Sequence, residues 1–218
     1  MELVAIENSR VIYLTHVHRP AGELYYPDAA AKLVERYSFK KYPSVEEMTR
    51  QPLVFGIGKI RDIQINELDI YQDGIIVFSR SDTDVLDEFI SDLFEWSEKE
   101  LGVLTIPMSR PEKYYESTLV VKSEIDLAQV ISPRDEVANM ANRLFLEVAP
   151  NKQLYELSGF LLDCDQFAFH GKRKPLRFAV ERRLGVPYSE NIFFSQAPLP
   201  TKGHLAFLRG LEDLGAPE

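Results

Sequence analysis

The chemistry that this sequence offers is concentrated in a basic run at positions 171–184. Over these positions six basic residues stand against one acid. Lysine and arginine bind phosphate as point charges or through paired hydrogen bonds, so the run favours a phosphate-bearing or acidic partner. A solvated loop followed by a strand with one wet face is the simpler alternative, because no stacking motif accompanies the charges. The basic residues of the run are Lys172, Arg173, Lys174, Arg177, Arg182 and Arg183.

An acidic segment lies at positions 82–100, where eight acids accompany one base. Apolar residues at helical spacing predict a single helix here. Like charges four residues apart destabilise a helix by roughly 0.2–0.5 kcal/mol a pair, so this helix needs a well-buried apolar side or a cationic cover. The basic run, from the same chain or from a second copy, is one candidate cover, and a solvated acidic face is the alternative. The acids of the predicted interface are Asp84, Glu88, Asp92 and Glu95.

Two histidines, His16 and His18, form the third candidate site. Residues two apart on a strand point to the same face, and two imidazoles placed in this way can bind a metal ion. A carboxylate such as Glu23 or Asp28 would have to supply a third ligand. The simpler alternative is a strand end without metal. The pair supports the hypothesis of a metal-dependent hydrolase and nothing more specific.

The single cysteine, Cys164, is flanked by Asp163 and Asp165. A nucleophilic thiol needs a positive environment, which two carboxylates oppose, so we expect Cys164 to be a buried strand residue. Gly56 and Gly58 lack the third glycine and the following helix of a phosphate-binding loop, and they favour a bulge or close backbone approach instead. Because no catalytic or cofactor motif is present, we expect a protein that is not an enzyme and needs no cofactor.

The composition limits the class of protein further. The chain of 218 residues is 45% hydrophobic and 27% charged, which is typical of a globular protein with a sizeable core. Its net charge of −9 disfavours nucleic-acid binding as a default, because phosphate repulsion must be overcome locally. One cysteine allows no internal disulfide, and no window approaches the ~20 apolar residues of a membrane span. We therefore expect a cytoplasmic protein with no membrane partner.

The elements that position these residues include a pattern that occurs twice. An apolar strand turns at 72–74, returns at 75–79 and leads into the acidic helix. The Asp-Gly pair of this turn is typical of a tight hairpin. A second apolar strand turns at 185–191, returns at 192–195 and leads into a helix from Thr201. Each copy is therefore a hairpin followed by a helix.

The two copies can be aligned residue by residue. Val77-Phe78-Ser79 matches Phe193-Phe194-Ser195, and Thr83 matches Thr201. A repeated hairpin–helix unit predicts an α+β fold with mostly antiparallel sheet, helices on one face and two related halves. We place the halves at 1–105 and 114–218, which either form separate domains or share one sheet.

A further helix is predicted after Ser132 and Pro133, which are typical of a helix start. Its apolar residues recur at helical spacing and are expected to face the core. These residues are Val137, Met140, Ala141, Leu144, Phe145 and Val148.

The function that we predict from these observations is a non-enzymatic interaction protein that self-associates or binds a protein partner. The missing catalytic constellation, the repeated architecture and the opposed charges at 82–100 and 171–184 motivate this prediction. Nucleic-acid or nucleotide binding through the basic run is the first alternative. A metal-dependent hydrolase that uses His16 and His18 is the second.

Overall fold

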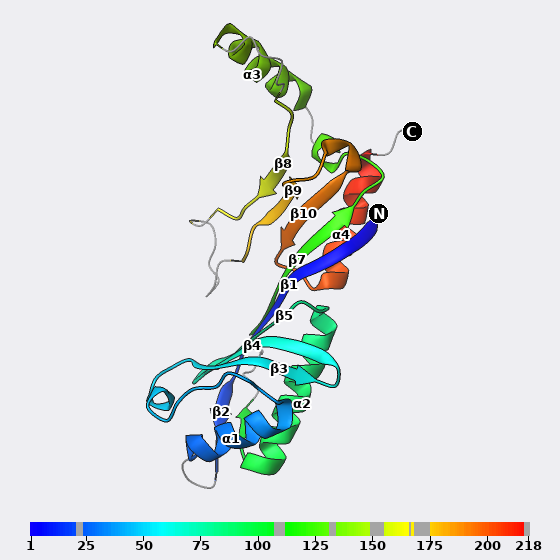
Figure 1. Cartoon of the computed structure of the whole chain (residues 1–218). Helices are drawn as coiled ribbons and strands as arrows, with labels where there is room; N and C mark the ends of the chain where they lie inside the picture. The colour runs from blue at the N-terminus through cyan, green and yellow to red at the C-terminus, as the bar shows by residue number, and fades with distance from the viewer. Residues whose placement is uncertain are drawn as a thin grey trace. The chain divides into compact units, whose positions relative to one another are not determined.

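The structure, a computed structural model, describes residues 1–20, 24–106, 112–130, 134–148, 155–165, 167 and 175–215 (Figure 1). The chain divides into two compact units. Unit 2 comprises Ile6–Ser117 and Pro198–Thr201, and unit 1 comprises Met1–Ala5, Thr118–Ala197 and Lys202–Glu218. Within the described residues, every helix is too short or too polar to cross a membrane.

Unit 2 is an antiparallel sheet covered by two helices. Strands β3 (Leu53–Ile60), β4 (Ile63–Tyr71) and β5 (Gly74–Ser79) pair in sequence, and β5 also pairs with β1 (Glu2–Leu14). Helices α1 (Tyr26–Tyr37) and α2 (Thr83–Leu101) pack on this sheet (Figure 1). The shorter elements are β2 (His16–His18), which pairs with β6 (Leu104–Ile106), and a single 3-10 turn at Glu47–Thr49.

The hairpin that the Asp-Gly pair predicts is present. Tyr71 pairs with Gly74 where β4 turns into β5. Gly74 has a φ of +157°, and a Cβ atom at this position would lie 2.4 Å from the carbonyl oxygen of Tyr13. Glycine is therefore required both by the backbone conformation and by the close approach of β1. The register that follows pairs Val77 with Val11.

The core of unit 2 lies between the helices and the sheet. The predicted apolar stripe of α2 is buried, and Leu86 and Phe89 are both completely inaccessible to solvent. Tyr37 of α1 makes edge-to-face contacts with Phe89 and Trp96, with ring centroids 4.9 Å and 6.1 Å apart. Such pairs contribute about 0.5–1.5 kcal/mol each beyond the area they bury. The burial of this stripe is what allows α2 to carry its acidic outer face.

Gly58 in β3 marks a close approach by a side chain, whereas the sequence favours a bulge or a close backbone approach. A Cβ atom at Gly58 would lie 2.4 Å from the ring of Phe39, which is itself only 3% exposed. We expect Gly58→Ala to lower the free energy of unfolding of unit 2 by about 1–3 kcal/mol, because the buried ring must shift. Urea unfolding monitored by Trp96, the single tryptophan, tests this prediction. Gly210→Ala, in a helix of unit 1 where a Cβ atom meets nothing within 4 Å, is the control and should leave the unfolding of unit 2 unchanged.

Unit 1 repeats the same arrangement with different elements. Strand β10 (Ile192–Ala197) pairs antiparallel with β9 (Phe178–Arg182), which pairs antiparallel with β8 (Gly159–Leu162). The hydrogen-bonded strand order is β3-β4-β5-β1-β7-β10-β9-β8, where β7 is Glu112–Lys122. The other elements are α3 (Arg134–Val148), α4 (Thr201–Gly215) and two 3-10 turns at Leu127–Val130 and Tyr188–Glu190.

The α+β fold with two related halves is confirmed. The hairpin β4–β5 leads into α2, and the hairpin β9–β10 leads into α4. The aligned residues also share their environment, because Ser79 and Ser195 are both buried and so are Thr83 and Thr201. Small hydroxyl residues therefore occupy equivalent buried positions at the end of the second hairpin strand and at the start of the helix.

Candidate interaction site

The acidic face of α2 carries its cationic partners within unit 2. Asp92 accepts a hydrogen bond of 2.7 Å from Arg36 and another of 2.7 Å from the hydroxyl of Tyr37. Glu88 forms an ion pair of 3.1 Å with Arg61. These contacts come from α1 and from the loop between β3 and β4, and they relieve part of the repulsion along the helix.

A further acid, Asp87, is held in the same way. It forms an ion pair of 2.5 Å with Lys113 and accepts a hydrogen bond of 2.7 Å from the hydroxyl of Tyr115. Asp84 and Glu95, the other two acids of the predicted interface, are exposed. Cations of the same unit therefore pair with three of the eight acids of segment 82–100.

The ionisation of the Asp92 cluster follows from its geometry. Burial alone would raise the pKa of Asp92, but the hydrogen bonds from Arg36 and Tyr37 outweigh it, and the pKa is lowered overall. The hydrogen bond to Asp92 correspondingly raises the pKa of Arg36. Burial and the neighbouring carboxylate both raise the pKa of Tyr37. The cluster is therefore a stable ion pair at neutral pH, with no group poised to exchange a proton.

The basic run is described only in part. Lys172, Arg173 and Lys174 lie outside the described residues, while Arg177 is exposed and Arg183 is half-buried. The cations that pair with acids of α2 are Arg36, Arg61 and Lys113, and these do not belong to the run. The prediction that the run binds phosphate or a partner stays a prediction.

Arg182 has a different environment from the rest of the run. Its side chain is only 8% exposed, and it forms an ion pair with Asp126. It also donates a hydrogen bond of 2.8 Å to the carbonyl oxygen of Tyr188, and its guanidinium group lies 4.2 Å from the centre of that ring. These contacts tie β9 to the Tyr188–Glu190 turn, so Arg182 stabilises unit 1 from within.

The histidine pair lies on β2, where His16 is exposed and the side chain of His18 is outside the described part. Among the side chains that the structure describes, no three His, Cys, Asp or Glu residues are grouped to hold a metal ion. Cys164 is exposed, so the prediction that it is buried is wrong. It lies two residues beyond the end of β8.

A serine–histidine contact that the sequence did not predict lies inside unit 1. The Oγ of Ser195 is 2.8 Å from Nε2 of His204, and both residues are inaccessible to solvent. Ser195 donates its hydroxyl proton to the carbonyl oxygen of Ala179, so it accepts a hydrogen bond from the histidine. A general base would have to accept the serine proton instead. The pair is therefore structural.

Helix α3 is the element whose environment differs most from the prediction. The exposed fractions of Val137, Met140 and Leu144 are 55%, 58% and 58%, so the prediction that these residues face the core is wrong. With Ala141, which is also exposed, they follow the spacing i, i+3, i+4 and i+7. This spacing places them in one stripe along the helix, which we call the α3 stripe.

The contacts that hold α3 use a neighbouring face of the helix. Asn142 donates a hydrogen bond of 2.9 Å to the carbonyl oxygen of Tyr155, and the ring of Phe145 packs edge-on against Tyr155 at 5.0 Å. Both residues lie to one side of the α3 stripe, which leaves the stripe itself open. More exposed apolar residues follow along the chain, and these are Tyr155, Leu161, Leu162 and Phe167.

Comparison with known proteins adds little. No family model matches the sequence, and no curated protein matches it. Among solved structures, the chain is similar to Methanococcus jannaschii TBP, with 13% identity over 96% of each chain and a TM-score of 0.47. The function of this chain is therefore inferred from its own residues.

Proposed function

We propose that this chain is a non-enzymatic interaction protein that self-associates through the α3 stripe. The observation that carries the proposal is the exposure of Val137, Met140 and Leu144 on one face of one helix. Leaving three large apolar side chains in water forgoes about 1.5–3 kcal/mol for each one that could be fully buried. A second chain that covers the stripe recovers part of this free energy.

A second copy of the same helix is the occupant that fits the stripe best. Homodimers are mostly two-fold symmetric, so one patch must be complementary to itself. A narrow seam of apolar residues spaced by three and four positions is the pattern with which helices pair in coiled coils. Ala141 lies within the stripe and lets two helix backbones approach closely.

The neighbouring strand supports an interface in this part of unit 1. Among the described residues, β8 has β9 as its paired strand and ends the strand order. Leu161 and Leu162, on opposite faces of β8, are both about half exposed. Proteins usually protect an apolar edge strand of this kind, and a partner chain is one way to do so. By contrast, three acids of α2, Asp87, Glu88 and Asp92, already have cationic partners in their own unit.

The test measures the mass of the protein as a function of its concentration. We expect sedimentation velocity and native mass spectrometry to show a species of twice the 25.0 kDa chain mass that increases with concentration. Met140→Asp combined with Leu144→Asp should weaken this dimer by at least about a hundredfold, because it places charge in the apolar seam. Asn139→Asp, which adds a charge on the opposite side of the same helix, should leave the dimer intact.

A monomer at every concentration would overturn the proposal, and so would a dimer that survives the double substitution. Nucleic acid retained by a monomeric protein, and lost when Lys172, Arg173 and Lys174 become alanine, would favour the nucleic-acid alternative instead. Stoichiometric metal that is lost with His16→Ala would favour the hydrolase alternative.

A further inference from the structure

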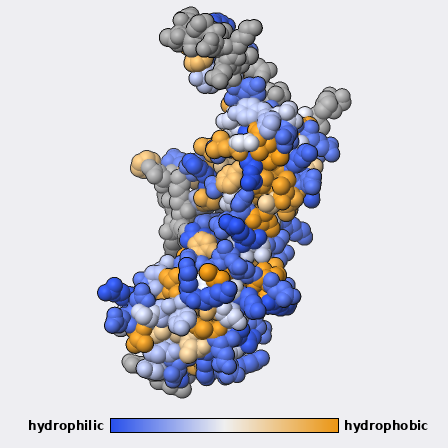
Figure 2. All heavy atoms as spheres, viewed as in Figure 1, coloured by the Kyte–Doolittle hydropathy of each residue, from blue (hydrophilic) through white to orange (hydrophobic). Residues whose placement is uncertain are grey.

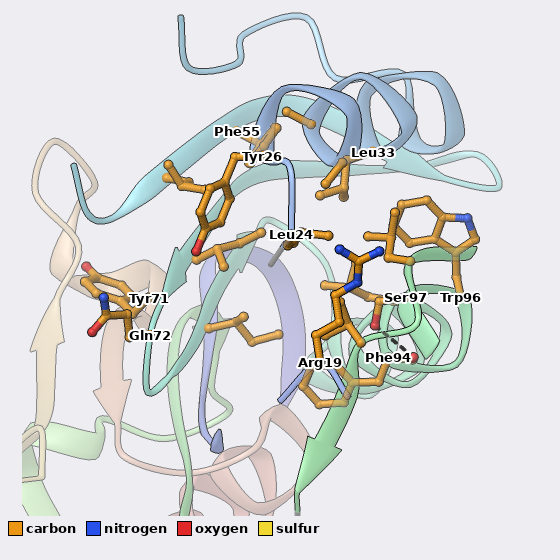
Figure 3. A pocket seen from close by; sticks show the side chains of 18 of the residues that line it. Arg19, Leu24, Tyr26, Leu33, Phe55, Tyr71, Gln72, Phe94, Trp96 and Ser97 are labelled. Atoms are coloured by element: carbon orange, nitrogen blue, oxygen red, sulfur yellow. Dashed lines mark hydrogen bonds between the residues drawn. The ribbon is translucent and has the colours of Figure 1, made fainter. Parts of the chain in front are cut away.

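A cavity of about 470 Å³ lies inside unit 2, and residues of α2 form part of its wall. It lies between α1, α2 and the end of the sheet where β4 turns into β5 (Figure 3). Most of its lining is apolar, and Leu33, Phe55 and Leu93 are among the buried residues that contribute. Sites for small molecules commonly have volumes of about 300–1,000 Å³ and an apolar lining with a few polar groups. This cavity has the size and lining of such a site.

One side of the cavity carries a positive charge. Among the described residues that line the cavity, Arg19 is the only acidic or basic residue. Figure 3 shows Arg19 on the same side as Phe94, Trp96 and Ser97. A guanidinium group has five N–H donors, so it can keep a contact with the protein and still bind a carboxylate through two parallel hydrogen bonds.

The opposite side of the cavity is polar but uncharged. Figure 3 shows Tyr71 and Gln72 there, away from Arg19. The backbone N–H of Gln72 donates a hydrogen bond of 2.9 Å to Oε1 of Gln51, which also lines the cavity. The contact joins the start of β3 to the β4–β5 turn and fixes this side. The cavity therefore offers a cation on one side, apolar walls along its length and neutral polar groups on the other side.

We propose that this cavity binds a small amphipathic anion, with a carboxylate at Arg19 and an apolar body between α1 and α2. The apolar body would contact Leu33, Leu93 and Trp96, which supply the free energy of burial. The charge of Arg19 selects the carboxylate, because an ion pair is stronger where apolar walls exclude water. A highly charged ligand such as a nucleotide does not fit the part of the lining that the structure describes, which has one cation and few polar donors.

Decanoate is a suitable probe, and decanol is its uncharged equivalent. We expect calorimetric titration to show saturable binding of decanoate at one site per chain. Arg19→Gln should weaken decanoate binding at least about tenfold, since a charge-assisted hydrogen bond is lost, and should leave decanol binding unchanged. Arg80→Gln removes the same charge from an exposed position elsewhere in unit 2 and should behave like the unmodified protein.

A second variant locates the binding within this cavity. Ser97→Leu adds apolar volume to the wall beside Arg19 and should weaken decanoate and decanol alike. Arg19→Lys retains the charge and should bind decanoate better than Arg19→Gln does. Each variant is first checked by thermal melting, and if Arg19→Gln does not fold, Ser97→Leu and Arg19→Lys carry the test.

The proposal is overturned if decanoate shows no saturable binding. It is also overturned if Arg19→Gln weakens decanoate and decanol equally, or if Ser97→Leu changes neither. These outcomes are independent of the dimer, because the α3 stripe belongs to unit 1 and the cavity belongs to unit 2.

Discussion

Replacing Thr83 and Thr201 together by valine is expected to lower the free energy of unfolding of unit 2 by about 2–6 kcal/mol. The backbone N–H of Thr83 donates a hydrogen bond of 3.2 Å to Oγ1 of Thr201, and the N–H of Thr201 donates one of 3.0 Å to Oγ1 of Thr83. Both residues are inaccessible to solvent. Valine has almost the same shape but no acceptor, so each substitution leaves one buried N–H group without its partner.

The size of this effect follows from where the two residues lie. Each is the first residue of a helix, whose first N–H groups have no acceptor within the helix itself. Losing a side chain that caps such a group costs about 0.5–2 kcal/mol even at exposed helix ends, and burial increases the cost. The reciprocal contact therefore satisfies two helix starts with two hydroxyl groups.

Urea unfolding followed by the fluorescence of Trp96 measures the effect, because this tryptophan is part of the unit 2 core. The two single variants and the double variant form a thermodynamic cycle, which shows whether the two hydrogen bonds depend on each other. Thr49→Val removes a hydroxyl that donates to the carbonyl oxygen of Glu46 at an exposed position, where water can replace the hydrogen bond. It should change the free energy of unfolding by no more than about 0.5 kcal/mol. A loss below about 1 kcal/mol in the double variant would contradict the prediction.

The sequence predicts the hairpins and α2 well because their signals are local. The Asp73-Gly74 pair marks one turn, and the helical spacing of Leu86, Phe89 and Leu93 marks the buried face of α2. The contact between Thr83 and Thr201 joins residues 118 positions apart. Aligning the two repeats shows that these threonines are equivalent, but no pattern in the sequence shows that they touch each other.

The spacing of apolar residues in an amphipathic helix likewise does not predict what surrounds that helix. The periodicity of α3 predicts its apolar stripe correctly, yet Met140 and Leu144 are exposed, because periodicity does not say which surface covers the stripe. The same limit applies to the acids of α2. Their repulsion predicts that cations lie nearby, and the structure places Arg36 there, which is 56 positions away from Asp92. Cys164 was expected inside a strand that in fact ends at Leu162.

Unit 1 is expected to lose stability as the pH falls from about 6.5 towards 4, because of His204. Burial lowers the pKa of this histidine from its ordinary 6.5 to about 4 in the folded protein. In the unfolded chain the imidazole binds a proton near pH 6.5, whereas in the folded protein it does so only near pH 4. Between these values the unfolded state binds more protons, so the free energy of unfolding falls by about 1.4 kcal/mol for each pH unit.

The pKa of His204 is lowered because of the site that the residue occupies in unit 1. The imidazole is inaccessible to solvent and its Nε2 lies 2.8 Å from Oγ of Ser195, which accepts the hydrogen bond. The neutral ring already donates this hydrogen bond, and burial disfavours the charge that a further proton on the ring would create. His204→Gln keeps an amide donor for Ser195 but removes the titration.

We expect the difference in unfolding free energy between the unmodified protein and His204→Gln to shift by about 2 kcal/mol in favour of the variant between pH 6.5 and pH 5. Urea unfolding at these pH values, combined with hydrogen exchange of the α4 amides, measures the shift in unit 1. Comparing the two proteins cancels the carboxylates, most of which titrate below this range. His16→Gln, which removes an exposed histidine, should keep the unmodified pH dependence. Parallel pH profiles for the unmodified protein and His204→Gln would show that His204 is not the group responsible.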